Sequence, residues 1–561
     1  MSNYSAGRFM STKNKMMTIR LAISSTRVSI FSIFFRLIPA FIGVALVTQH
    51  LLATEYRATN VSQLQSYTTQ LKAGDTLTVA PGTYTLSSWS INGLTGNSNQ
   101  WITIKAEGKV IIQGTSTGSN VVSLRNSRFL NFIGFEITST TAPDAGIDGI
   151  KFESNAPSSY INFENLYIHH VSGNGICIMA DGCSFVTVRN SEISYATTCG
   201  IYWGFAKKYI VHDVLVANNY IHHCPPDPIS STGYGIQFKG ESYRGRFINN
   251  VLHDVGGTSR SGLIVYYGRT YEQGDHPEDM NIVRGNVLWN CRAEGITAMA
   301  DALIENNIVF DANVGINIQT YTESGMSVAN YVENLTIRNN TIFRCTTSCL
   351  TIPSSAWNSV GTNVNVTGNA AYQTTTSKRA IAGNGGSQQV HIAGNIYYGT
   401  SQLVRGVAAG NGLNDFQNVA ASTQVPNLNF YPVANSPLLN RVDLPVDWPT
   451  QDFNGSPRPN GNLADAGAYE YVVPDNPGWV INGGYKPPIN DKNSKIVACN
   501  FEPQSSVSVQ WQPSAYWSYL EFSPSLLPAN WQTVSGPLYT TNVSLALPSG
   551  LDQAFLRVRH E

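Results

Sequence analysis

The chain has few charged residues and almost no stretch with the periodicity of an α-helix. Asp, Glu, Lys and Arg make up 13% of its 561 residues, and the formal net charge is −1. This balance gives no reason to expect nucleic acid or an anionic membrane as a partner. No CxxC pair or HxxxH spacing occurs, which argues against a zinc site of the common kinds. What the chain has instead is 48 glycines among 42% hydrophobic residues, the composition of a folded protein rich in turns.

Acidic residues are also missing from the first part of the chain, where none precedes Glu55. Several lysines and arginines occur there, followed by the apolar run 37–47 and by Ala53. This order predicts an export signal over residues 1–53, and a mature protein that is secreted or held at the cell surface. The apolar run is shorter than a membrane span, so we expect no span in the mature chain.

One short phrase recurs through the middle of the chain at uneven intervals. Its copies are FENLYIHH, VRNSEISY, VANNYIHH, FINNVLHD, VRGNVLWN, IENNIVFD and IRNNTIFR, with weaker copies VTGNAAYQ and IAGNIYYG. Aligned, they form a column of Asn219, Asn250, Asn286, Asn307, Asn340, Asn369 and Asn395. A repeated unit with variable insertions indicates a solenoid with loops on one side. Stacked Asn side chains predict an amide ladder at a turn.

Each copy is accompanied by a second predicted strand that opens with Gly-Ile or a similar pair. These strands are DGIKFES, NGICIMA, CGIYWGF, YGIQFKG, SGLIVYY, EGITAMA, VGINIQT and SCLTIPS. Strands that pair only with their equivalents one coil away form parallel sheets without helices. The sequence therefore predicts an all-β protein with a parallel β-helix over residues 54–471; its right-handed sense is an expectation of the resemblance given below.

The composition changes toward the C-terminus. Residues 426–471 are dense in Pro, Gly and Asn, and we expect them to close the end of the coil. Four prolines within residues 472–495 predict a linker. The phrases SVSVQW, YWSYLEF, VSLALP and AFLRVRH predict a small β-sandwich-like domain over residues 496–561.

Two further columns of the repeat concern cysteine and histidine. Cys224, Cys291 and Cys345 share a column of small apolar residues, which predicts buried thiols rather than disulfides. Local bridges remain open for two other pairs, Cys177–Cys183 and Cys345–Cys349. His169, His222 and His253 share a column with Ser194, Trp289, Phe310 and Phe343, which favours a stacked aromatic ladder over a proton relay.

The Asn-containing coils, the N-terminal GDTLTVAPGTYT and the later DFNGSPRP and DAGAYEY resemble right-handed parallel β-helix proteins of the pectate-lyase-like superfamily. In layout the chain is most similar to polysaccharide lyases of the chondroitinase B and alginate lyase kind. The resemblance covers about residues 59–471 and implies a polysaccharide-degrading or polysaccharide-binding protein. The superfamily also contains hydrolases, epimerases, tailspikes and adhesins, so the fold does not fix the activity.

Alternation along the Gly-Ile strands separates inward from outward side chains. Phe238 takes an inward position, so Gln237 and Lys239 face outward, and Tyr266 falls beside Lys239 on the next coil. Long insertions rich in Tyr, Arg and acidic residues flank these positions, and loops on a rigid sheet are where sites usually occur. The aromatic and polar residues that we expect to bind a sugar chain are Tyr202, Trp203, Gln237, Tyr267 and Tyr271.

The chemistry of a lyase assigns roles to the charged residues of this face. A base must remove the proton beside a uronate carboxylate, and a positive group must neutralise that carboxylate. Lys239 is the predicted base, and Arg260 or Arg269 is the predicted neutralising group. Tyr266 or His253 is expected to protonate the departing oxygen. In the resembled chondroitinase B-like family a lysine and an arginine of the next coil share this work, but that family's Asn-Lys-Ser phrase is missing here.

The resembled family holds calcium with paired glutamates that precede its lysine, and these glutamates are missing here. If calcium binds, Glu241 and Asp254 are the oxygen ligands we assign to it. The predicted substrate is an acidic, uronate-containing polysaccharide cleaved by β-elimination, and the protein is expected to act as a monomer. The alternatives are a non-catalytic glycan-binding or surface protein, a uronate epimerase and a glycoside hydrolase. A hydrolase requires two facing carboxylates, and the repeat offers no such pair.

Overall fold

The computed structural model describes most of the chain after the first 52 residues. The described residues are 53–143, 145–205, 208–266, 280–319, 332–352, 363–383, 390–443, 451–487, 496–502, 506–511, 518–523, 532–538, 542–546 and 555–560. The predicted export signal lies outside them. Within the described part no helix is both long enough and apolar enough to cross a membrane.

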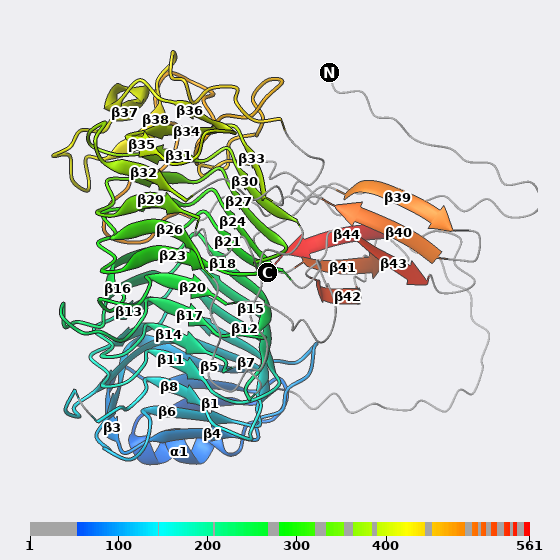
Figure 1. Ribbon diagram of the computed structural model, residues 1–561. Helices are drawn as coiled ribbons and strands as arrows, with labels where there is room; N and C mark the ends of the chain where they lie inside the picture. The colour runs from blue at the N-terminus through cyan, green and yellow to red at the C-terminus, as the bar shows by residue number, and fades with distance from the viewer. Residues whose placement is uncertain are drawn as a thin grey trace, which may run out of the picture. The chain divides into compact units, whose positions relative to one another are not determined.

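Two units make up the chain, and the larger one, residues 53–490, is a β-helix (Figure 1). One face of the coil is a twelve-stranded parallel sheet. Its strands are β4 (Trp89–Asn92), β6 (Val122–Arg125), β8 (Ile150–Phe152), β11 (Ile176–Ile178), β14 (Ile201–Trp203), β17 (Ile236–Phe238), β20 (Leu263–Val265), β23 (Glu294–Ala298), β26 (Val314–Ile318), β29 (Ser348–Thr351), β32 (Arg379–Ala382) and β35 (Thr400–Ser401).

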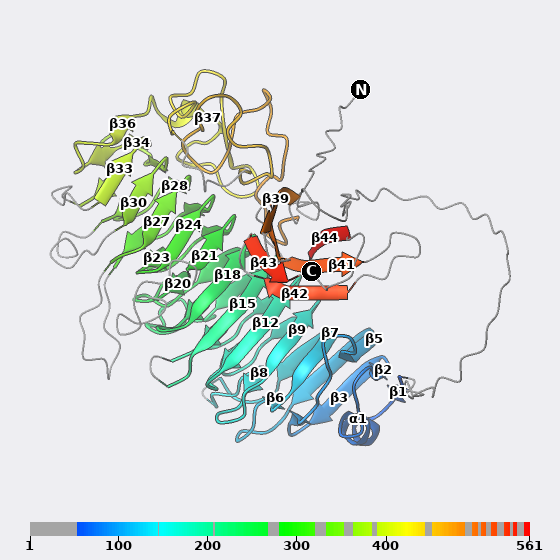
Figure 2. The same ribbon diagram turned by 90° about the vertical axis from the view of Figure 1, so that its right-hand side faces the viewer.

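The rest of the coil is a 24-stranded sheet folded into two stacks that meet at a sharp turn. The first stack, seen strand beside strand in Figure 2, is β1 (Glu55–Ala58), β2 (Thr76–Val79), β5 (Ile102–Gly114), β7 (Arg128–Ser139), β9 (Ser159–Glu164), β12 (Cys183–Arg189), β15 (Val211–Ala217), β18 (Tyr243–Ile248), β21 (Asn281–Arg284), β24 (Ala302–Glu305), β27 (Leu335–Arg338), β30 (Val364–Thr367) and β33 (Val390–Ala393).

The second stack is β3 (Gly82–Leu86), β10 (Tyr167–His169), β13 (Glu192–Ser194), β16 (Tyr220–Cys224), β19 (Val251–Val255), β22 (Val287–Trp289), β25 (Ile308–Phe310), β28 (Thr341–Phe343), β31 (Ala370–Tyr372), β34 (Asn395–Tyr398) and β36 (Val407–Ala409). The long strands β5 and β7 run through both stacks. Every pairing between coils is parallel and joins a strand to its equivalent one coil away, which confirms the predicted architecture.

The turn between the two stacks explains why Asn-Asn pairs recur. The first residue of each pair has a positive φ, such as 55° at Asn249, a conformation that Asn tolerates better than most residues. The second residue is buried and forms the ladder: Asn250 Nδ2 donates to Asn286 Oδ1 at 2.9 Å, and Asn286 Nδ2 donates to Asn307 Oδ1 at 3.0 Å. The predicted amide ladder is confirmed.

The interior of the coil is a continuous apolar core, and the cysteine column belongs to it. Cys224, Cys291 and Cys345 are buried thiols, as predicted. Cys177, Cys183 and Cys349 are also free thiols, so neither of the local bridges left open by the sequence forms.

The sequence gives no sign of the one α-helix that the described residues contain, α1 (Val61–Thr68). The side chain of Asn60 accepts a hydrogen bond from the backbone N–H of Gln63 at 2.9 Å and caps the helix. Leu64 and Thr68 are its buried residues. The helix covers the first coil, at the end of the solenoid where Figure 1 labels α1, and so protects the open end of the sheets.

The coil ends at β36, earlier than residue 471. Residues 413–443 and 451–487, here called the covering segment, include the 3-10 helix η4 (Leu413–Asp415) and the hairpin β37 (Phe416–Asn418) and β38 (Asn429–Pro432). They lie along the outer side of the second stack: Phe430 packs on Phe310 and Phe343, and Ala468 N donates to Thr341 Oγ1 at 2.9 Å. The segment therefore covers the side of the coil, whereas the sequence predicts closure of its end.

The sequence also predicts a linker from residue 472, and the described part of that range, 472–487, is instead packed on the coil. Lys486 is 2% exposed, and its Nζ donates to Asn249 Oδ1 at 2.9 Å and to Gly285 O at 3.1 Å. The composition of this range could not predict the docking, because the docking depends on contacts with residues more than 200 positions away in the sequence.

The phrases DFNGSPRP and DAGAYEY supply a buried ionic cluster within the covering segment. The Nε of Arg458 lies 3.3 Å from Glu470 Oε2, and both side chains are almost completely buried. Asp452 accepts backbone hydrogen bonds from Asn454 and Ser456, each at 2.8 Å. These charged residues hold the loops of the segment together and are structural.

The second unit contains the C-terminal strands, which form two three-stranded antiparallel sheets. One sheet is β39 (Ile496–Glu502), β40 (Ser506–Trp511) and β43 (Asn542–Ala546), and the other is β42 (Gln532–Leu538), β41 (Ser518–Ser523) and β44 (Phe555–His560). Two small antiparallel sheets agree with the predicted β domain.

Candidate functional site

The outer face of the twelve-stranded sheet carries the residues that the sequence singles out. Tyr202 pairs with Gln237 in the outward column. The next outward position is Lys239, whose N–H donates to Trp203 O at 2.9 Å, and then Tyr266, whose N–H donates to Phe238 O at 3.0 Å. These bonds continue the strand register, so Lys239 and Tyr266 lie side by side on adjacent coils, as the alternation predicts.

A cavity of about 300 Å³ opens on this face. Its floor is formed by outward side chains of the sheet, and its wall by the loops that lead into β14, β17 and β20. The lining residues are Thr198, Cys199, Tyr202, Thr232, Gly233, Tyr234, Gln237, Lys239, Ser259, Arg260, Ser261, Ile264, Tyr266, Glu294, Met299 and Gln319. Five predicted site residues, Tyr202, Gln237, Lys239, Arg260 and Tyr266, are thus brought together.

Aromatic rings surround the amine of Lys239. Its Nζ lies 5.5 Å from the ring centre of Tyr202, 5.3 Å from that of Phe205 and 5.6 Å from that of Tyr266. Ring faces at this range attract a cation. Gly204 makes room for the lysine, because a Cβ there would lie 3.3 Å from Lys239 Cβ and 2.6 Å from Ser242 Oγ.

Tyr266 is 4% exposed and accepts a hydrogen bond from Gln237 Nε2 at 3.3 Å. Burial raises its pKa far above the ordinary value, the neighbouring Tyr234 raises it further, and the charge of Lys239 offsets only part of this. The phenol therefore stays protonated at neutral pH. It can donate a proton or a hydrogen bond, but it cannot serve as a base there.

Arg260 is exposed at the rim, with its guanidinium carbon 6.0 Å from the ring centre of Tyr234 and its Nη1 donating to Ser259 O at 3.1 Å. Glu294 is the one carboxylate among the described residues that line the cavity, and its Oε2 accepts from Ser261 Oγ at 3.2 Å. Among the described residues of the lining, two cations thus face one anion. This balance suits a negatively charged ligand.

Some predicted residues do not join this site. Trp203 is 0% exposed and points into the coil, so the prediction that it stacks on a sugar is wrong. His253 does not line the cavity, because it lies in the second stack, between His222 and Trp289. Arg269, Tyr267 and Tyr271 lie outside the described residues.

The histidine column is a stacked ladder, as predicted. His222 and His253 are parallel at 5.2 Å between ring centres, and Trp289 follows His253 at 4.6 Å. Asp254 accepts from His253 Nδ1 at 2.6 Å and belongs to a group with His223 and His253. That group does not contain Glu241, which is 5% exposed, so the two residues assigned to calcium are not brought together in it.

Sequence reasoning missed Phe205, Tyr234 and Glu294. The last two belong to one column, the residue before the Gly of each Gly-Ile strand, whose other members include Asp148, Asn174, Cys199 and Ser261. Most members of that column are polar, which is visible in the sequence, but the cavity is lined by four of the members named here, Cys199, Tyr234, Ser261 and Glu294. Phe205 lies just after β14 and carries no such signal.

Comparison with known proteins agrees with the fold. Residues 83–330 match the family model for a right-handed beta helix region. No curated protein sequence matches the chain. Solved structures similar to it include the PL6 family alginate lyase AlyGC, at 16% identity and a TM-score of 0.46 over 68% of this chain. The chain covers 56% of the AlyGC chain.

Two further similar structures have comparable scores. An alginate lyase from Paenibacillus sp. str. FPU-7 is 16% identical over 62% of this chain and 99% of its own, with a TM-score of 0.36. Pectate lyase Pel9A is 16% identical over 75% of this chain and 96% of its own, with a TM-score of 0.35. The family match and the observed strand pairing together confirm the right-handed parallel β-helix.

Proposed function

We propose that the protein is a polysaccharide lyase that cleaves an acidic, uronate-containing chain by β-elimination in this cavity. The observation that carries the proposal is the meeting of Lys239, Arg260 and Tyr266 in one cavity of about 300 Å³ on the outer face of the sheet. The reaction requires a base, a group that neutralises the carboxylate and a proton donor, and an amine, a guanidinium and a protonated phenol can fill these roles.

In the proposed reaction, Arg260 binds the uronate carboxylate and neutralises it, which makes the adjacent C5–H more acidic. Lys239 removes the C5 proton with its amine nitrogen. The C4–O bond breaks as the C4=C5 double bond forms, and the Tyr266 O–H gives its proton to the departing oxygen. The ammonium of Lys239 then returns a proton to the phenolate, so both groups regain their starting state.

Calcium has no part in this scheme. A calcium ion takes six to eight oxygen ligands and commonly several carboxylates. The described residues of the cavity offer one carboxylate, Glu294, which already accepts from Ser261. This donor set does not fit a calcium site, so neutralisation is assigned to Arg260.

A second candidate function is glycan binding without chemistry. It is favoured by the aromatic rings around Lys239, because their attraction for a cation suits a charged anchor for a carboxylate better than a base. Tyr202 would then provide a surface on which a sugar ring packs. A glycoside hydrolase is disfavoured, since the described lining has one carboxylate where hydrolysis needs two.

The test is incubation with alginate, pectate, chondroitin and ulvan, with the ultraviolet absorbance of the unsaturated sugar end as the readout. Lys239→Met and Tyr266→Phe should each lower the rate by about 10²–10⁴-fold, the usual value of a general acid or base. Lys208→Met is the matched control, because Lys208 is exposed, lies 5.0 Å over the ring of Tyr209 and does not line the cavity.

The outcomes separate the candidates. Full activity of Lys239→Met contradicts the proposed base. Binding of one polymer with no absorbance change, lost in Lys239→Met, supports the glycan-binding alternative. Solvent deuterium entering C5 without an unsaturated product identifies an epimerase, and new reducing ends without absorbance identify a hydrolase.

A further inference from the structure

A second group of chemically active side chains lies on the other side of the coil, at the end of the second stack. His223 and Asp254 occupy equivalent positions on adjacent coils, directly after the paired residues His222 and His253. Both have positive φ, 53° and 51°. This conformation interrupts the alternation of the strand, so two consecutive side chains on each coil lie close together on its outer side.

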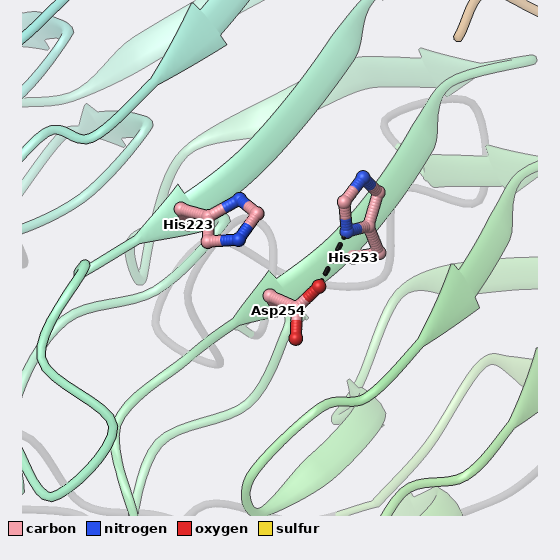
Figure 3. Close-up of side chains that lie close together, drawn as sticks. All are labelled: His223, His253 and Asp254. Carbon is pink, nitrogen blue, oxygen red and sulfur yellow. Dashed lines mark hydrogen bonds and ion pairs between the residues drawn. The ribbon is translucent and has the colours of Figure 1, made fainter. Parts of the chain in front are cut away.

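The donor atoms converge. His223, His253 and Asp254 each offer one ligand atom, and these atoms all lie within 4.8 Å of one another (Figure 3). The Nδ1 of His253 and the Oδ2 of Asp254 are 2.6 Å apart. Two imidazole nitrogens and one carboxylate oxygen form a donor set common among zinc and other divalent transition-metal sites.

A chain of hydrogen bonds fixes the tautomer of His223. The Nε2 of His222 lies 3.2 Å from Glu192 Oε1, and because a carboxylate only accepts, this nitrogen carries the proton. The Nδ1 of His222 therefore accepts from Nδ1–H of His223 at 2.9 Å. The Nε2 of His223 is left with its lone pair, which is the state that binds a metal.

The ring of His253 also has a hydrogen-bond partner on its second nitrogen. The Nε2 of His253 lies 2.7 Å from the hydroxyl of Tyr220. When a cation binds Nδ1, the ring proton moves from Nδ1 to Nε2 and Nε2–H donates to that hydroxyl oxygen, so the ring keeps its orientation. Metal-bound histidines usually have such a partner on the second nitrogen.

The charged groups around the three side chains are of both signs. Asp254 contributes a carboxylate to the group itself, and Glu192 lies behind His222. Arg292, whose Nη1 donates to Pro225 O and to Gly256 O, is a cation near His223.

We propose that His223, His253 and Asp254 bind one divalent transition-metal ion of the zinc class, with Glu192 and Tyr220 orienting the two rings through hydrogen bonds. The ion would join two adjacent coils, β16 and β19. All three ligands are partly exposed, which leaves a coordination position for water. The site lies on a different sheet from the cavity of Lys239, and the proposal does not depend on the lyase function.

The test is calorimetric titration of the full-length chain, without an affinity tag, with Zn²⁺. One ion should bind per chain, and His223→Gln and Asp254→Asn should each weaken binding at least tenfold. His170→Gln is the matched control: His170 has the same place in its coil and the same bond to the preceding histidine, His169 Nδ1 at 2.8 Å. The next coil offers Tyr195 there instead of an aspartate, so this variant should bind as the unmodified protein does.

Thermal unfolding gives a second readout, because a ligand that binds the folded state stabilises it. At one Zn²⁺ concentration, the midpoint of the unmodified protein and of His170→Gln should rise more than that of Asp254→Asn. Circular dichroism before titration shows whether each variant is folded. Lack of saturable binding, or equal binding by folded His223→Gln and Asp254→Asn, overturns the proposal.

Discussion

Replacing Asn286 by alanine tests how much the amide ladder contributes to the coil. Its side chain is completely buried. The Oδ1 accepts from both the backbone N–H and the Nδ2 of Asn250, each at 2.9 Å. The Nδ2 donates to Phe247 O at 2.8 Å and to Asn307 Oδ1 at 3.0 Å. One residue thus links the coil before it to the coil after it.

The magnitude follows from the groups that Asn286→Ala leaves behind. Two buried donors, the N–H and one Nδ2 hydrogen of Asn250, lose their acceptor, at about 1–3 kcal/mol each. We expect a loss of about 4 kcal/mol in the free energy of unfolding. The control is Asn92→Ala: Asn92 is exposed on β4 and accepts one long bond, 3.5 Å from Asn126 Nδ2. A surface change of this kind should stay within about 0.5 kcal/mol.

Urea unfolding followed by circular dichroism measures both changes, provided that the slope of free energy against urea is the same in all variants. A loss below about 1 kcal/mol for Asn286→Ala refutes the account of the ladder. A double-mutant cycle sharpens the test. Asn250→Ala removes the side chain that Asn286→Ala leaves unsatisfied, so the double variant should lose less than the sum of the single losses.

Three further predictions concern the covering segment. Arg458→Met leaves Glu470 buried without its cation, and should cost about 3–5 kcal/mol in urea unfolding. Burial raises the pKa of Glu470 to about 7, above its unfolded value, so the folded state holds a proton on this carboxyl at pH 5 and releases it toward pH 8. The free energy of unfolding lost in Arg458→Met should therefore be larger at pH 8, where the carboxylate is charged, than at pH 5. Burial lowers the pKa of Lys486 to about 7, so between pH 7 and 10 the unfolded state binds more protons than the folded state. The free energy of unfolding should therefore rise over this range by at most about 1.4 kcal/mol per pH unit. This rise should vanish in Lys486→Met. Phe430→Ala removes a ring that is 1% exposed, and should lower the free energy of unfolding by about 3–5 kcal/mol and increase proteolysis of the segment.

The parts of the fold that repeat could be predicted, because each column of the repeat samples one environment many times. The Asn ladder, the buried cysteine column and the outward position of Lys239 all follow from such columns. The same alternation places Trp203 inside the coil, so its assignment to sugar binding contradicted the register that positioned Lys239. The prediction for Trp203 relied on its aromatic side chain and disregarded its inward position in the strand.

The parts that do not repeat could not be predicted in this way. Helix α1 is a short helix of eight residues that occurs outside the repeat, so the periodicity of the repeat does not indicate it. The docking of Lys486 brings a lysine from a proline-rich stretch into a buried position beside Asn249, and composition indicates the opposite. Contacts of this kind are not repeated from coil to coil, so no column of the repeat can indicate them.

One column nevertheless indicates which coils the part of the covering segment around Phe430 covers. Along the second stack, the outward residue changes from His222 and His253 to Trp289, Phe310 and Phe343. The two phenylalanines are the ones that Phe430 covers. Apolar side chains on the outside of a coil require a cover, whereas imidazoles can face solvent. The column therefore changes where the part of the covering segment around Phe430 ends, whereas Tyr485 and Lys486 of the same segment continue past this point to Tyr220 and Asn249.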